Sequence, residues 1–181
     1  VDLDHRDRYG IHLLLFAVTF VACVVAGGYL AARTELWGSR FEWLDPIFLG
    51  DGLRYAIALL LFLTVPEFGH YFAAMKHRVP ASLPYFIPSP FPQTLFGTFG
   101  AVIRMSPYSP NRRALFEIAA AGPVAGLVVA LPVTLAGISL SQLHHVASIG
   151  QGIELGEPLI FKAMSWWVFG PIPEGYELVT H

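Results

Sequence analysis

The chain has 181 residues, of which 55% are hydrophobic and 13% are charged, and its formal net charge is −2. Soluble domains usually carry about 25% charged residues, so the composition excludes an ordinary soluble domain. The near-neutral charge and the lack of a basic run in the sequence exclude a nucleic-acid-binding protein. The composition therefore predicts a membrane protein, whose first partner is the lipid bilayer.

Three apolar stretches are each long enough to cross a bilayer, for which about 20 residues suffice. They comprise residues 11–32, 53–75 and 114–140. The first exceeds the apolar core of about 7–15 residues found in a cleaved signal peptide, so we expect a retained span. Asp51 precedes the second stretch and is expected to cap its helix. The pattern predicts an all-α polytopic membrane protein with about three transmembrane helices.

The eleven Lys and Arg residues are distributed unequally around these spans. Two precede the first span and five lie between the second and third, whereas three lie between the first span and the start of the second, with Arg54 as the last of them, and one follows the third. Basic residues collect on the cytoplasmic side of membrane proteins. We therefore expect the N-terminus and the loop of residues 76–113 to be cytoplasmic.

The segment between the second and third spans is expected to be extended. Five prolines occur within residues 79–93, and each one removes a backbone donor that a helix needs. Residues 94–105 are apolar and punctuated by glycine, which favours a short β-strand or hairpin. Extended backbone survives at membrane depth only where protein or a water-filled cavity covers it, so this element should lie against the helices.

The third apolar stretch contains Gly122 and Gly126, four residues apart. A helix face without side chains at this spacing allows another helix to approach closely. Pro123 lies between them and is expected to kink the helix. We predict that Gly122, Pro123 and Gly126 serve helix packing.

Residues 141–181 are predicted to form a loop and an interfacial segment rather than a fourth span. His144 and His145 are interpreted as loop residues. Residues 154–170 include the Trp166-Trp167 pair and resemble an element that lies in the membrane interface. The whole chain, residues 1–181, is expected to form a single membrane domain.

The second apolar stretch contains the string Pro66-Glu67-Phe68-Gly69-His70. Ionisable residues at membrane depth usually mark a functional site. The string differs by one residue from His-Glu-x-x-His, in which two imidazoles bind zinc and the glutamate is the general base. A purely structural Glu67–His70 pair is the alternative, because residues three apart on a helix can interact.

Together, these segments resemble the site-2 protease family of intramembrane zinc metalloproteases, in particular the subgroup with a Gly-x-Phe-Gly-Ala element. The resemblance extends over about residues 54–181 and rests on a combination of motifs. The matching segments are residues 67–74, 97–101, 111–114, 121–126, 156–158 and 170–176.

The resemblance implies a role for each matching residue. It implies that His70 is a zinc ligand and that Glu67 activates the water that attacks a peptide bond. It also implies that five residues bind the unwound transmembrane segment of a membrane-protein substrate. These residues are Gly97, Thr98, Phe99, Gly100 and Ala101. Glycine suits such a strand because it lets a second backbone approach.

Two departures from the family pattern concern zinc. Pro66 occupies the position of the first histidine ligand, and the aspartate ligand on a later Leu-Asp-Gly helix is absent, as in a fragment. A catalytic zinc needs three protein ligands, so we expect this chain neither to bind catalytic zinc nor to cleave substrate. Two alternatives remain: a non-catalytic, substrate-binding pseudoprotease, and a proton-coupled transporter or channel fragment with Glu67 and His70 as a proton relay.

Overall fold

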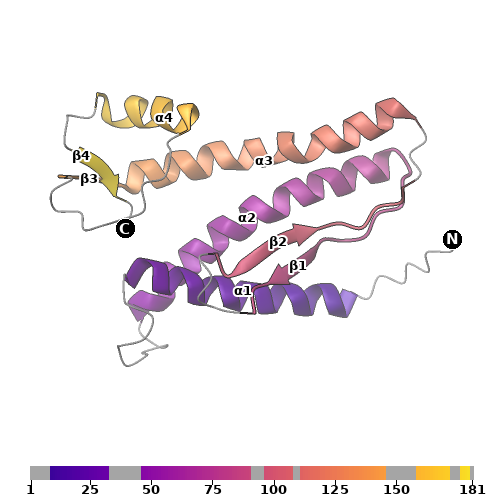
Figure 1. The fold of residues 1–181 in the computed structure, drawn as a ribbon, viewed down its shortest axis with the longest axis horizontal. Helices are drawn as coiled ribbons and strands as arrows, with labels where there is room; N and C mark the ends of the chain where they lie inside the picture. Colours follow the sequence, from indigo (N-terminus) through magenta and orange to yellow (C-terminus); the bar gives the residue numbers. More distant parts are fainter. Residues whose placement is uncertain are drawn as a thin grey trace. The chain divides into compact units, whose positions relative to one another are not determined.

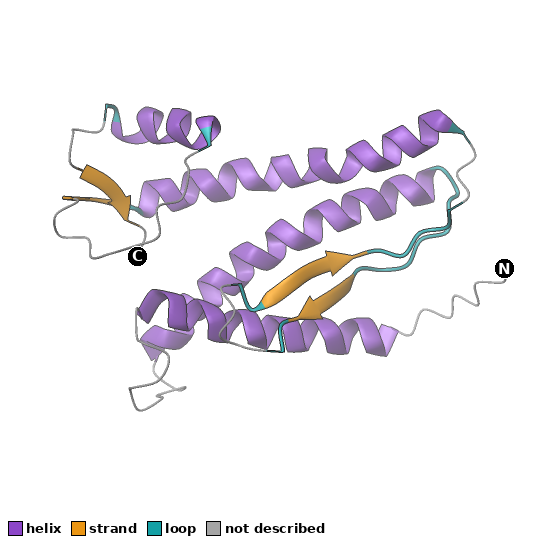
Figure 2. Ribbon diagram, viewed as in Figure 1, coloured by secondary structure: helices purple, strands orange, loops and turns teal. Residues whose placement is uncertain are grey.

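The computed structural model describes residues 9–32, 46–90, 96–107, 111–145, 158–171 and 176–179. These residues form two compact units, residues 1–129 and 130–181, and each unit is considered by itself. Figure 1 shows the elements along the chain and Figure 2 shows them by type. In order they are α1 (Tyr9–Ala32), α2 (Pro46–Lys76), β1 (Tyr85–Pro88), β2 (Thr98–Val102), α3 (Arg112–Leu140), β3 (Gln142–His145), α4 (Leu159–Phe169) and β4 (Tyr176–Val179).

Within the described part of the chain, three helices are long and apolar enough to cross a membrane, namely α1, α2 and α3. The 24 residues of α1 correspond to about 36 Å at 1.5 Å per residue, which exceeds a hydrocarbon core of about 30 Å. A small antiparallel sheet lies between α2 and α3 in the sequence. The predicted fold class, a helical multi-pass membrane protein with a short β element, is therefore confirmed. The cytoplasmic side of the loop of residues 76–113 remains a prediction.

The start of α2 differs from the prediction. The helix begins at Pro46, where the fixed φ of proline suits the first helical position. Asp51 therefore lies inside the helix, where its carboxylate pairs with Arg54 at 2.9 Å. The prediction that Asp51 caps this helix was wrong because the helix extends one and a half turns further toward the N-terminus.

Prolines lie within two of the continuous helices, and α3 contains Pro132 as well as the proline between its first two glycines. Pro66 is inside α2 and Pro123 is inside α3. Since proline has no N–H, the helical hydrogen bond to the carbonyl of Phe62 is missing in α2. Membrane helices tolerate such prolines because neighbouring groups compensate for the freed carbonyl. The predicted kink at Pro123 remains a prediction.

The core of the first unit joins α1, α2 and β1. Its centre is a cluster of Cys23, Ala56, Leu60 and Phe86. The two helices approach to backbone contact, because a Cβ at Gly52 would lie only 2.2 Å from the carbonyl oxygen of Val24. Close approach through glycine is the usual way in which membrane helices gain packing energy.

β1 and β2 form an antiparallel ribbon that contacts α1 and α2 (Figure 2). Tyr85 pairs with Val102, and the register shifts at Pro88. The predicted strand within residues 94–105 is β2. Its partner β1 comes from the proline-rich segment, which sequence analysis expected to be extended but did not pair. α1 packs against the β1 side of the ribbon. There, His12 Nδ1 donates to the carbonyl of Pro84 at 3.1 Å.

In the second unit, β3 pairs with β4 in an antiparallel register that joins Gln142 to Val179 and His145 to Tyr176. The interpretation of His144 and His145 as loop residues was therefore wrong. The strand is formed with a partner more than 30 residues away, which no local pattern indicated. α4 has 11 residues, or about 16 Å, which is too short to cross a bilayer. The prediction of one membrane domain over residues 1–181 remains a prediction.

Candidate active site

His70 on α2 forms a hydrogen bond with the backbone of α3. Its Nδ1 atom lies 2.8 Å from the carbonyl oxygen of Ile118. Because a carbonyl can only accept a hydrogen bond, Nδ1 carries a proton, and in the neutral form of the ring the lone pair is then on Nε2. A backbone carbonyl commonly holds the ring of a metal-ligating histidine in this way. The hydrogen bond of Nδ1 thus goes to Ile118, and the Glu67–His70 pair remains an alternative that rests on electrostatic proximity alone.

Gly122 on α3 provides the space that His70 occupies. A Cβ at Gly122 would lie 2.0 Å from Nε2, 2.3 Å from Cε1 and 2.4 Å from Cδ2 of His70. These three distances are similar, which places the Cβ position over the face of the ring rather than in its plane. Any side chain at position 122 would therefore displace the imidazole.

Two further glycines complete this contact between α2 and α3. A Cβ at Gly69 would lie 2.7 Å from the carbonyl oxygen of Ala121, and a Cβ at Gly126 would lie 3.0 Å from Cγ of Pro66. Pro123, which lies between the two glycines of α3, is exposed. We call Pro66, Gly69, His70, Gly122 and Gly126 the α2–α3 seam.

Glu67 faces the β-ribbon instead. Its half-buried carboxylate lies within electrostatic range of His70 and near the backbone N–H of Ile103. Ile103 follows directly after β2. The motif glutamate and the motif histidine therefore point toward protein on two sides of α2, toward the ribbon and toward α3, and neither is left facing only lipid.

The five residues expected to bind substrate have different surroundings. Gly97 is buried, has φ +69°, and would place a Cβ 2.6 Å from the carbonyl oxygen of Ala22, so it packs on α1. The Thr98 hydroxyl donates to the carbonyl of Ile87 at 2.8 Å and accepts from the N–H of Gly100 at 3.1 Å. Thr98 therefore stabilises the ribbon itself.

The next three residues of β2 differ from one another in exposure. Ala101 is partly buried and packs against the core cluster of the first unit. Phe99 is 65% exposed. Gly100 has φ +107°, and a Cβ there would meet no atom within 4 Å. Open space therefore surrounds only the Phe99–Gly100 part of the predicted substrate segment.

The side chains of the motif do not fit a catalytic zinc. Among the described residues, no group of three or more His, Cys, Asp or Glu side chains is placed to hold a metal ion. The Pro66 side chain has no atom that can bind a metal, so of the two motif positions that the family resemblance assigns to zinc ligands only His70 has a donor. A catalytic site requires three protein ligands and an open position.

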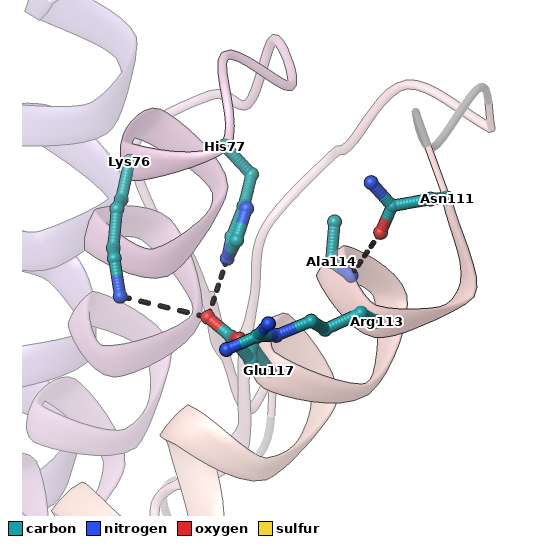
Figure 3. A network of polar contacts seen from close by, with 6 residues as sticks. All are labelled: Lys76, His77, Asn111, Arg113, Ala114 and Glu117. Carbon is teal, nitrogen blue, oxygen red and sulfur yellow. Dashed lines mark hydrogen bonds and ion pairs between the residues drawn. The ribbon is translucent and has the colours of Figure 1, made fainter.

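A polar cluster at the end of α2 and the start of α3 was not found by sequence analysis (Figure 3). Glu117 accepts a hydrogen bond from Nε2 of His77 at 2.8 Å and from Nε of Arg113 at 2.9 Å. Nζ of Lys76 lies 3.5 Å from the same carboxylate. The spacing of Arg113 and Glu117 was a local signal for one of these contacts. The contacts to α2 join residues about 40 positions apart and had no local signal.

The start of α3 has its own cap. The side-chain oxygen of Asn111 accepts the N–H of Ala114 at 2.8 Å (Figure 3). This contact satisfies one of the free donors at a helix N-terminus. It fixes where α3 begins and therefore where Glu117 lies, one and a half turns later.

Comparison with known proteins finds similarity to one peptidase family. The sequence model of Peptidase family M50 matches residues 54–173. The chain is 30% identical over 149 residues to "Probable zinc metalloprotease EGY1, chloroplastic" of Oryza sativa subsp. japonica, covering 74% of this chain and 25% of that protein.

Two further relatives come from Arabidopsis thaliana. The EGY1 protein of this plant is 34% identical over 147 residues, covering 74% of this chain and 26% of that protein. "Probable zinc metalloprotease EGY2, chloroplastic" is 37% identical over 100 residues, covering 55% of this chain and 17% of that protein. The chain thus spans about a quarter of the length of the first two relatives. No solved structure matches it.

Proposed function

Since the chain belongs to peptidase family M50, the site-2 protease family that its motifs resemble, we propose that it holds an extended substrate segment beside Glu67 without cleaving it. The substrate is the transmembrane segment of a membrane protein. The chain is then the substrate-holding part of a membrane-embedded metalloprotease, and with Pro66 it acts as a non-catalytic, pseudoprotease form of that part.

The observation that carries this proposal is that α2 contacts β2 and that the Glu67 carboxylate lies near the backbone N–H of Ile103. Ile103 directly follows β2, so the motif glutamate lies at the end of the strand that the family resemblance assigns to substrate. A substrate segment aligned along β2 would therefore run past the Glu67 carboxylate.

The ribbon has the features of a strand that accepts another strand. Among the described strands, β2 pairs only with β1. An exposed strand edge binds an extended peptide through main-chain hydrogen bonds, and specificity comes from alternate side chains. The open space at Gly100 and the exposed ring of Phe99 supply room for a second backbone and an apolar contact for its side chains.

The absence of cleavage follows from the ligand set of the described residues. Pro66 takes the position of the first ligand and packs on Gly126, and no group of three donors is present in the described part of the chain. Membership in a peptidase family accounts for the Glu67–His70 motif, so the proton-relay alternative has no separate support.

Crosslinking tests substrate holding directly. Cys23 is the only cysteine, so a Cys23→Ala background allows a single cysteine to be placed by Phe99→Cys. The probe is a synthetic single-span peptide that carries a cysteine beside a glycine pair in its apolar segment. Val128 on α3 is 68% exposed, close to the 65% of Phe99, so Val128→Cys is the matched control.

We expect the disulfide with the peptide to form at position 99 and not at position 128. Equal crosslinking at both positions would contradict specific holding, because it would indicate random collision in the bilayer. Mass spectrometry of the same peptide should find no cleavage. Cleavage that depends on added zinc and is lost in His70→Ala would overturn the non-catalytic part of the proposal.

A further inference from the structure

We infer that Glu117 is a positioning residue for His70: its contacts with the end of α2 hold the carbonyl of Ile118 against Nδ1 and so fix the tautomer of His70. This inference does not rest on the proposed function, because it concerns the state of His70 without substrate or metal. It assigns a role to the polar cluster around Glu117, which lies outside the sequence motif.

Three residues in and just after α2 face α3. His70 and Ala74 lie in α2, and His77 directly follows it, with its N–H still bonded to the Ala73 carbonyl as in a helix. Their separations of four and three positions place all three on one face. His70 contacts the Ile118 carbonyl, Ala74 lies in a buried cluster with Ile118, and His77 contacts Glu117. One face of α2 is thus in contact with two consecutive residues of α3.

On α3, two adjacent residues receive the contacts from α2. Glu117 and Ile118 are adjacent, so their side chains leave the helix about 100° apart. Glu117 receives hydrogen bonds from Arg113 of its own helix and from His77 after α2. Ile118 is 2% exposed and packs with Ala74 and Val79. Movement of Glu117 relative to His77 must therefore carry the Ile118 carbonyl with it.

The carbonyl of Ile118 can reach His70 because of the residue one helical turn later. A helical carbonyl normally accepts from the N–H four residues later, but its second lone pair remains able to accept. Side chains usually shield that lone pair. Gly122 is four residues after Ile118 and has no side chain, which leaves the carbonyl open to the imidazole that fills this space.

The tautomer of His70 is measurable by ¹⁵N NMR on histidine-labelled protein in detergent, at about pH 8.5, where an ordinary imidazole is neutral. The chain has 7 histidines, and a His70→Gln variant assigns the signal. In the unmodified chain we expect the Nδ1–H form. In Glu117→Ala we expect at least about a fivefold fall in the ratio of Nδ1–H to Nε2–H forms, equivalent to one ordinary hydrogen bond.

The matched control is Asp51→Ala, which removes the ion pair with Arg54 in the same helix. The Asp51 side chain is 29% exposed, against 30% for Glu117. This control should leave the tautomer unchanged. A change of the same size in Asp51→Ala would overturn the inference, because it would show a general response of α2.

A second variant, His77→Leu, removes the α2 side of the contact and keeps Glu117 and Arg113 in place. It should shift the tautomer ratio in the same direction, and it decides the question if circular dichroism shows that Glu117→Ala does not fold. An unchanged tautomer in either folded variant would overturn the inference. Neither measurement uses substrate or zinc, so this result and the crosslinking result are independent.

Discussion

Nδ1 of His70 lies 2.8 Å from the carbonyl oxygen of Ile118, across 48 positions of the chain. This contact turns the motif histidine toward α3, while Glu67 turns toward the β-ribbon. The two ionisable residues of the motif are therefore placed by different neighbours.

Gly122→Ala should destabilise the first unit. The new Cβ would lie 2.0 Å from Nε2 of His70, so the ring or α3 must move, and overpacking of this kind costs about 1–3 kcal/mol. Gly137→Ala is the matched control on the same helix, since a Cβ there meets nothing within 4 Å. Thermal unfolding in detergent should show a loss for position 122 and no loss for position 137. Equal midpoints for the two variants would contradict the packing described for the seam.

Gly97→Ala should be more damaging than Gly100→Ala. Both residues have positive φ, at +69° and +107°, so both substitutions strain the backbone. Only Gly97 also meets protein, because its Cβ would lie 2.6 Å from the Ala22 carbonyl oxygen. We expect an additional loss of about 1–2 kcal/mol for Gly97→Ala, measured by denaturant unfolding in detergent. In the crosslinking experiment, Gly100→Ala should reduce capture at position 99 with less effect on unfolding, and the opposite order would refute the separate roles assigned to these glycines.

Zinc binding should depend on position 66. The unmodified chain should bind less than one equivalent of zinc after dialysis, because the described residues include no group of three side chains placed to hold a metal ion. Pro66→His places a second imidazole one helical turn from His70 and should raise zinc affinity at least about tenfold. Pro66→Ala is the control, since it removes the proline without adding a donor. Stoichiometric zinc in the unmodified chain that is lost in His70→Ala would show that other groups complete the site.

α4 should lie in the membrane interface. It is too short to cross, and its Trp166 and Trp167 are 65% and 73% exposed. Tryptophan is enriched where headgroups meet the apolar core. In a Trp37→Phe, Trp43→Phe background, the fluorescence of the pair should be quenched more by lipids brominated near the headgroup than by lipids brominated near the chain end. Stronger quenching from the chain end would place α4 deeper than proposed.

Several features could be read from the sequence because they depend on local properties. The three spans follow from the lengths of apolar stretches, and the extended segment follows from five prolines that cannot continue a helix. The family followed from motifs with fixed spacing, including Glu67 and His70. The helix starts were less certain: α2 begins at Pro46, so the cap expected at Asp51 was wrong.

The pairing of β3 with β4 had no local signal. His144 and His145 were interpreted as loop residues, but they lie in a strand whose partner begins at Tyr176. A short polar strand is stable only with its partner, and the partner is far away in sequence. The segment alone therefore could not indicate it.

The sequence by itself determined the class of this protein, its membrane spans, its family and the lack of a metal-binding group at Pro66, because residue type and spacing are sufficient for each. Only the tertiary structure decided that His70 turns to Ile118, that Gly97 packs on α1, and that Glu117 joins α3 to the end of α2. These contacts join residues 40 to 75 positions apart. Which side chains meet over such separations depends on how the helices pack, and no local pattern contains that information.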